Sequence, residues 1–145
     1  MIARVKDIKT IDSLNIVEFD FNNITLKMMS LELHKEVKLE SKVKLLVKPS
    51  NVIISKNYIE DISLSNQTLA KIVAIENGEL LSSISLEIGD TTFESIITKE
   101  SSKRLDLQEG NIVNILIKAS DLSILRVLHD WLSIKCRLCT IFALI

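Results

Sequence analysis

The chain has 145 residues, of which 47% are hydrophobic and 26% are charged, and its net charge is −1. This balance is typical of a globular protein and gives no basic surface for nucleic acid. Aromatic residues make up 4%, so few side chains could stack on bases. Because the N-terminus lacks the apolar core of a signal peptide and no run of 18 apolar residues occurs, we expect a cytoplasmic protein without a membrane span.

The first thirty residues predict a strand followed by a β-hairpin. Apolar residues spaced among charged ones indicate the first strand at 2–9. Residues 17–21 and 24–28 alternate apolar and polar side chains, the period of a half-buried strand. The dipeptide Asn22-Asn23 between them favours a tight turn.

The second half repeats this plan about 67 to 70 positions later. Residues 69–75 match the first strand, and 84–88 and 92–97 predict a second hairpin around Gly89 and Asp90. After each hairpin we expect one short helix. These helices are predicted at 31–35, with Ser30 as N-cap, and at 99–105, with Thr98 as N-cap.

The clearest duplication is between segments 43–54 and 113–124. The same residue type recurs at five aligned pairs, Val43/Val113, Leu46/Leu116, Lys48/Lys118, Ser50/Ser120 and Ile54/Ile124. In each copy a lysine and a serine, two positions apart, follow an apolar strand. A cation and a hydroxyl donor therefore lie close together at the end of a buried strand. Residues 51–55 and 121–125 are expected to close each unit.

Five short strands and one helical turn per unit predict an all-β fold with short helices, arranged as tandem OB-like five-stranded Greek-key barrels. We expect a first barrel at 1–56, a linker at 57–65, a second barrel at 66–125 and a tail at 126–145. Apolar residues at helical spacing in the tail favour an amphipathic helix. Units of about 60 residues bury little surface alone, so pairing of units or chains is expected.

Enzyme chemistry finds little support in the sequence. The two histidines, His34 and His129, cannot complete a nucleophile-base-orienter set, and no P-loop or Rossmann glycine pattern is present. Cys136 and Cys139 with His129 supply at most three of the four ligands of a structural zinc site. We therefore predict neither an enzyme nor a site where side chains bind a metal directly.

Five segments, in this order, are similar to the molybdenum-pterin-binding protein (Mop) family, also called the TOBE domain: residues 64–67, 71–73, 97–101, 105–110 and 117–121. The resemblance is close over 63–125 and looser over 2–55, as in a tandem (di-Mop) arrangement. Known members of the family bind molybdate or tungstate rather than an intact pterin. They do so at interfaces between Mop units and assemble into trimers or hexamers.

The resemblance implies a cytoplasmic homo-oligomer, a trimer or a dimer of tandem units, that binds molybdate or tungstate for molybdenum storage or homeostasis. Because such domains also occur in molybdate-responsive regulators and in the ATPase of molybdate transporters, a ligand-sensing role is the alternative. A nucleic-acid-binding OB module is an alternative of another class. The low aromatic content and the slightly acidic charge argue against it.

A tetrahedral oxyanion offers only acceptors, so its site should present N–H and O–H donors and no carboxylate. The family motif falls in the second unit on Ser63, Ser65, Asn66, Gln67, Thr98, Ser101, Lys118, Ala119 and Ser120. The first unit keeps Ser30, Lys48 and Ser50. Pro49 stands where the second unit has Ala119 and lacks a backbone N–H, so we expect fewer or weaker sites from the first unit.

Overall fold

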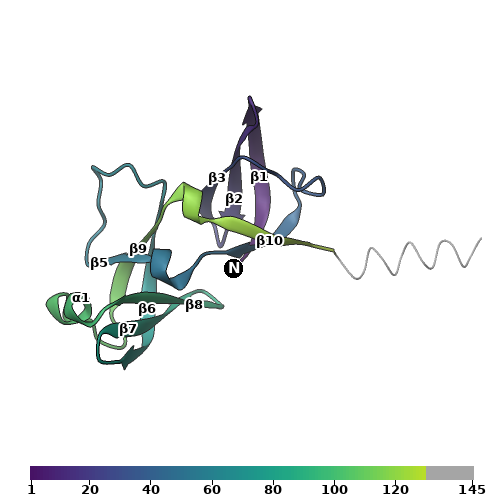
Figure 1. The fold of residues 1–145 in the computed structure, drawn as a ribbon. Helices are drawn as coiled ribbons and strands as arrows, with labels where there is room; N and C mark the ends of the chain where they lie inside the picture. The colour runs from purple at the N-terminus through teal and green to yellow at the C-terminus, as the bar shows by residue number, and fades with distance from the viewer. Residues whose placement is uncertain (130–145) are drawn as a thin grey trace, which may run out of the picture.

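A computed structural model describes residues 1–129 of the chain. The first half contains β1 (Ile2–Ile11), β2 (Leu14–Phe21), β3 (Ile24–Ser30), β4 (Lys42–Leu46), the 3-10 turn η1 (Pro49–Asn51) and β5 (Ile53–Ser55). The second half contains β6 (Asn66–Asn77), β7 (Leu81–Ile88), β8 (Thr91–Thr98), α1 (Lys99–Arg104), β9 (Ile112–Ile117), η2 (Ala119–Asp121) and β10 (Ser123–Leu128). The strands form two curled sheets (Figure 1). The predicted all-β, OB-like fold with short helices is confirmed.

Each sheet is closed by a strand from the other half of the chain. The strand orders are β10-β4-β1-β2-β3 and β5-β9-β6-β7-β8, with all neighbours antiparallel. Ser123 of β10 lies opposite Leu46, and Ile53 of β5 lies opposite Leu116. The expectation that each closing strand stays in its own unit is therefore wrong. In Figure 1, β10 leaves the second half and runs along the first sheet.

The hairpins form where the alternation predicts them. In β2, Val17 and Phe19 are fully buried, whereas the residues between them are more exposed. Asn22 and Asn23 have φ of 49° and 64°, the left-handed values that a two-residue turn between twisted strands requires and that asparagine tolerates. Gly89 has the equivalent value, 56°, in the second hairpin. Both predicted turns are confirmed.

The predicted helices have different outcomes. Helix α1 forms, and the Thr98 hydroxyl accepts a hydrogen bond from the Ser101 backbone N–H at 3.2 Å, so this N-cap is confirmed. No helix forms at residues 31–35. The Ser30 hydroxyl instead accepts from the Glu32 N–H at 3.2 Å, a local serine turn that competes with helix formation.

Asn66, at the start of β6, joins the two sheets. Its side-chain amide donates to the Lys27 carbonyl at 2.8 Å and accepts from the Lys27 N–H at 2.6 Å, which fills both backbone positions at the edge of β3. Asn66 is 2% exposed. Nearby, the Met1 amine lies 3.5 Å from the Leu45 carbonyl, and burial, with a smaller contribution from Lys44, lowers its pKa.

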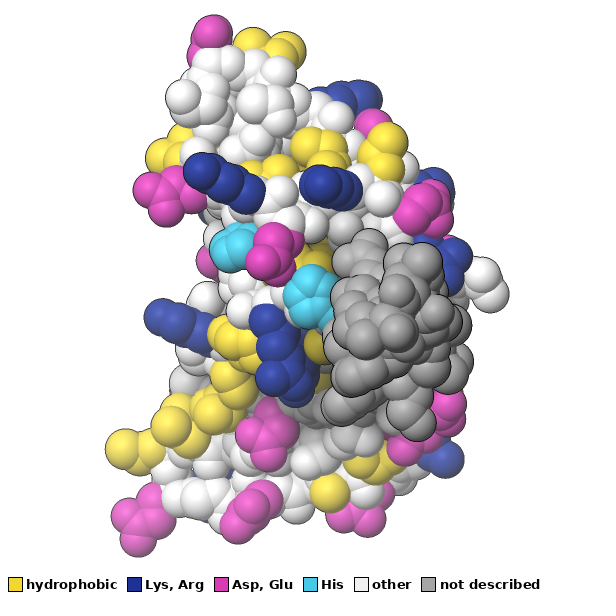
Figure 2. Space-filling model, turned by 90° about the vertical axis from the view of Figure 1, so that its right-hand side faces the viewer, with side chains coloured by type: hydrophobic (Ala, Val, Ile, Leu, Met, Phe, Trp, Pro, Cys, Tyr) yellow, Lys and Arg dark blue, Asp and Glu magenta, His cyan; other side chains and the backbone are white. Residues whose placement is uncertain are grey.

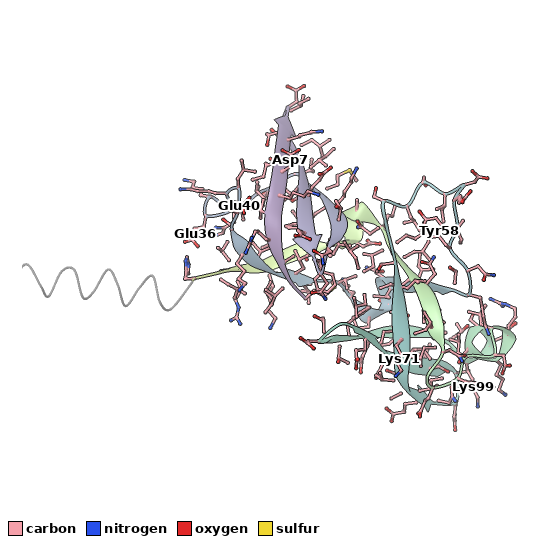
Figure 3. The ribbon with its side chains drawn as sticks, turned by 180° about the vertical axis from the view of Figure 1, so that it is seen from behind. Asp7, Glu36, Glu40, Tyr58, Lys71 and Lys99 are labelled. Atoms are coloured by element: carbon pink, nitrogen blue, oxygen red, sulfur yellow. The ribbon has the colours of Figure 1, made fainter. Side chains whose placement is uncertain are left out.

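The linker between β5 and β6 forms a loop beside the second sheet; Tyr58 lies on this loop, and Lys71 lies on the neighbouring sheet (Figure 3). The predicted tail begins differently, because residues 126–128 continue β10. The expected tail helix and the cysteine pair lie beyond the described residues. Within residues 1–129, no helix has the length and apolar character needed to cross a membrane.

Candidate functional site

Two corners of the chain have nearly the same backbone. Lys48 precedes η1 with φ −66° and ψ 134°, and Lys118 precedes η2 with φ −67° and ψ 140°. Each lysine carbonyl accepts from the N–H three residues on, Asn51 at 2.8 Å and Asp121 at 2.9 Å. The aligned segments of the sequence thus fold into two matching corners.

The exchange of closing strands brings these corners together. Because β10 pairs with β4, the end of η2 lies beside the segment that follows β4. The two corners border a solvent-open pocket of about 280 Å³ lined by Leu46, Lys48, Asn51, Ser120, Asp121 and Ser123. Two predicted site residues, Lys48 from the first half and Ser120 from the second, therefore line one pocket.

The pocket offers donors that are not engaged elsewhere in the protein. Within residues 1–129, no hydrogen bond or ion pair involves the side chains of Lys48, Asn51 or Ser120. The Ser123 hydroxyl already donates to the Leu46 carbonyl at 3.3 Å. An ammonium, an amide and a hydroxyl are the donor types that suit an oxyanion.

Asp121 also lines the pocket, so this pocket holds a carboxylate, which was not expected of an oxyanion site. Asn51 was not among the residues predicted for the site. Both residues could have been found from the alignment of the two segments, where they are partners, but that alignment does not reveal that they face the same pocket.

The other predicted residues lie outside the pocket, several of them near the second corner. Asn66, the first residue of β6, pairs with Ile117, the last residue of β9. Ser65, which precedes β6, and Lys118, which follows β9, therefore lie at the same end of this strand pair. The turn η2, which contains Ala119, packs against β3, the strand that ends at Ser30. Ser63 and Ser65 are exposed in the linker, and Ser50 is exposed on η1. None of these residues is among those that line the pocket.

The amides of Asn66 and Gln67 are used within the protein. Asn66 binds Lys27, as described above. The Gln67 side chain accepts from the Ile59 N–H and donates to the Ile59 carbonyl, both at 2.8 Å. Its oxygen also accepts from the buried Asn114 amide at 2.8 Å. These bonds hold the linker against the second sheet and leave less of each amide available for a ligand.

Thr98 and Ser101 lie away from the pocket. Their hydroxyls bond each other at 2.9 Å, and Arg104 donates to the Ser101 hydroxyl at 3.3 Å. The first corner is attached to β8 at Ser95, whose hydroxyl donates to the Val52 carbonyl at 2.7 Å. Thr98 is three strand residues beyond Ser95, a distance of about 10 Å along β8. Thr98 is therefore separated from the first corner and from the pocket.

A different hollow, of about 290 Å³, lies between β10 and the loop after β3 and contains none of the predicted donors. Among its lining residues are Glu32, His34, Glu36 and Arg126, and His129 lies 3.5 Å from Glu36. Figure 2 shows the face with the histidines, where acidic, basic and apolar side chains are intermixed. The hollow therefore presents both charge signs rather than converging donors.

Comparisons with known proteins agree with this fold. The TOBE domain model matches residues 62–124. The chain is 27% identical over 110 residues to the molybdate/tungstate import ATP-binding protein WtpC of Pyrococcus abyssi, a match that covers 76% of this chain and 32% of that protein. The chain thus spans about a third of the length of this curated relative.

A crystal structure of the cytoplasmic molybdate-binding protein ModG with molybdate bound has the same fold, with a TM-score of 0.77 at 22% identity. The match covers 85% of this chain and 92% of ModG. It includes both sheets, because the aligned share is larger than either half alone. Residues 62–124 therefore resemble the TOBE domain, and the chain as a whole has the fold of ModG.

Proposed function

We propose that the chain binds molybdate or tungstate in the pocket between its two corners and serves molybdenum storage or homeostasis in the cytoplasm. The observation that carries this proposal is the convergence of the Lys48, Asn51 and Ser120 side chains from both halves on one pocket. The TOBE match, the molybdate bound by ModG and the named substrates of WtpC support the choice of ligand. The role is one of binding rather than catalysis.

The pocket chemistry suits a tetrahedral dianion with four acceptor oxygens. Hydrogen bonds to charged groups contribute roughly 1.5–3 kcal/mol each. Three such donors contribute roughly 4.5–9 kcal/mol, so the costs of desolvation and ordering leave an affinity weaker than about micromolar. A volume of about 280 Å³ leaves room for the ion and for waters that complete its hydrogen bonds.

We further propose that the chain forms a homo-oligomer, a trimer or a dimer, in which each copy contributes both of its sheets with their exchanged closing strands. At the second corner, Lys118, Ala119 and Ser65 lie on exposed or half-exposed ends of strands and turns. Another copy could complete a site from these donors, and the exposed or half-exposed Ser63, Ser50 and Ser30 are further donors for such an interface. Mass in solution, measured with and without molybdate, tests this assembly.

One alternative is that the chain acts as the ligand-sensing part of a molybdate transport system. The WtpC match supports it, because the aligned region is about a third of an import ATPase. In that case the purified chain would bind molybdate and would also associate with a separate ATPase chain. Storage requires the first property alone.

Isothermal titration of the purified chain with molybdate, tungstate and sulfate tests the main proposal. We expect saturable binding of the first two and much weaker binding of sulfate. Lys48→Met should weaken molybdate binding about tenfold or more, because it removes the ammonium from the pocket. Lys9→Met, which makes the same charge change at the exposed end of β1, is the control and should bind normally. Absence of molybdate binding by the unmodified chain would refute the proposal.

A further variant tests the second corner separately. Lys118→Ala should reduce binding if the second corner also holds ligand, and the stoichiometry should fall while the Lys48 pocket stays occupied. If Lys118→Ala binds the same number of ions with the same affinity as the unmodified chain, the second corner is not a site.

A further inference from the structure

The pocket between the corners is chemically asymmetric. Asn51 of η1 and Asp121 of η2 occupy the same position in two corners that have matching backbone hydrogen bonds. Both line the pocket and both are half-buried. Asparagine can donate to an oxyanion, whereas an aspartate carboxylate can only accept.

Asp121 places a negative charge close to the proposed ligand. A pocket of about 280 Å³ corresponds to a sphere of roughly 4 Å radius, so a lining carboxylate lies about 6 Å from an ion near the centre. At that distance, a unit charge repelling a dianion in the dielectric of water lowers affinity roughly tenfold. Within residues 1–129, no ion pair or hydrogen bond neutralises the Asp121 carboxylate.

The same carboxylate affects oxyanions differently according to whether they carry a proton. Molybdate and tungstate at neutral pH have only acceptor oxygens facing Asp121. Hydrogen phosphate has one O–H, which can donate to a carboxylate and offset the repulsion. The Asp121 side chain therefore favours a protonated oxyanion over an unprotonated one of the same charge.

We propose that Asp121 is the specificity-determining residue of this pocket. Its carboxylate weakens the binding of unprotonated dianions, so the bound ligand exchanges readily. It also reduces the difference in affinity between molybdate and hydrogen phosphate. This inference rests on the proposed oxyanion function. Asn51, its partner in the other corner, acts in the opposite sense as a donor.

Titration calorimetry of the full chain with molybdate and with inorganic phosphate at about pH 8.2, where hydrogen phosphate is the main phosphate species, tests the inference. Asp121→Asn should bind molybdate roughly tenfold more tightly and bind phosphate no more tightly, so the ratio of the two affinities rises. Asn51→Asp should bind molybdate roughly tenfold more weakly. Asp61→Asn, in the exposed linker, makes the same charge change as Asp121→Asn and should alter neither affinity.

Each outcome discriminates between the two proposals. If the unmodified chain binds molybdate and Asp121→Asn binds it equally well, the inference is wrong and the proposed function stands. If Asp121→Asn and Asp61→Asn tighten molybdate binding equally, the effect belongs to net charge and the inference is again wrong. If only Asp121→Asn binds molybdate, the proposed function of the natural chain fails while the role of Asp121 stands. If neither protein binds it, both are overturned.

Discussion

Replacing Asn66 with alanine tests how the two sheets are held together. The Asn66 amide makes two short hydrogen bonds to the backbone of Lys27, across the boundary between β6 and β3. Alanine removes both bonds and leaves space where the amide was. Asparagine at this position also belongs to the family motif, so the substitution separates a structural role from a role in ligand binding.

The expected loss of stability follows from the number of bonds. A neutral hydrogen bond contributes about 1 kcal/mol net, so two contribute about 2 kcal/mol. Because Asn66 is buried, this value is a lower bound, and any Lys27 backbone group left without a partner adds to the cost. With a urea m-value of about 2 kcal/mol/M, the unfolding midpoint should fall by at least about 1 M.

Equilibrium urea unfolding without any oxyanion provides the measurement. Ser65→Ala, at the exposed neighbouring position, is the matched control and should stay within about 0.5 kcal/mol of the unmodified chain. Asn66→Asp keeps the acceptor but loses the donor and buries a charge, so it should lose at least as much stability as Asn66→Ala. Equal midpoints for Asn66→Ala and Ser65→Ala would refute the reasoning, because the two bonds would then contribute nothing.

Three further changes test other contacts. Ser95→Ala removes the buried bond to the Val52 carbonyl and should lower the free energy of unfolding by about 1–2 kcal/mol; an unchanged thermal midpoint would contradict this. Gln67→Ala frees both backbone groups of Ile59, so hydrogen exchange at the Ile59 amide should accelerate at least tenfold, and unchanged protection would count against the bonds. Gly89→Ala places a Cβ at φ +56° and 2.9 Å from a side-chain nitrogen of the first hairpin turn, and should cost about 1–2 kcal/mol in urea unfolding. A neutral result there would show that this turn relaxes freely.

Features set by neighbouring residues were predictable from the sequence. The alternation at 17–21 and 84–88 specifies which side chains face the core, because the strand period is two. Thr98 caps α1 through a bond to a residue three positions away. The failure at 31–35 has an equally local cause, since the Ser30 hydroxyl bonds the N–H of Glu32 and closes a turn where a helix was expected.

The partners of the closing strands could not be predicted in this way. Segments 43–54 and 113–124 are so similar that either copy of the last strand could pair with either sheet edge by pattern alone. The strand β5 has only three residues, too few for alternation to specify a partner. The choice depends on tertiary contacts, such as the Ser95 bond to Val52 and the Asn66 bonds to Lys27, which lie between residues 39 to 43 positions apart.

The composition of the candidate site follows from that choice. If each closing strand had stayed in its own half, Lys48 would have faced its own unit, and no pairing of β10 with β4 would hold Ser120 beside it. The sequence identified both residues as donors but assigned them to separate units, with fewer or weaker sites expected from the first. Exchange instead combines a lysine and an asparagine from one corner with a serine and an aspartate from the other. A duplicated sequence has thereby produced one unsymmetrical pocket, in which the differences between the copies, Asn51 against Asp121 above all, determine the affinity for an anion.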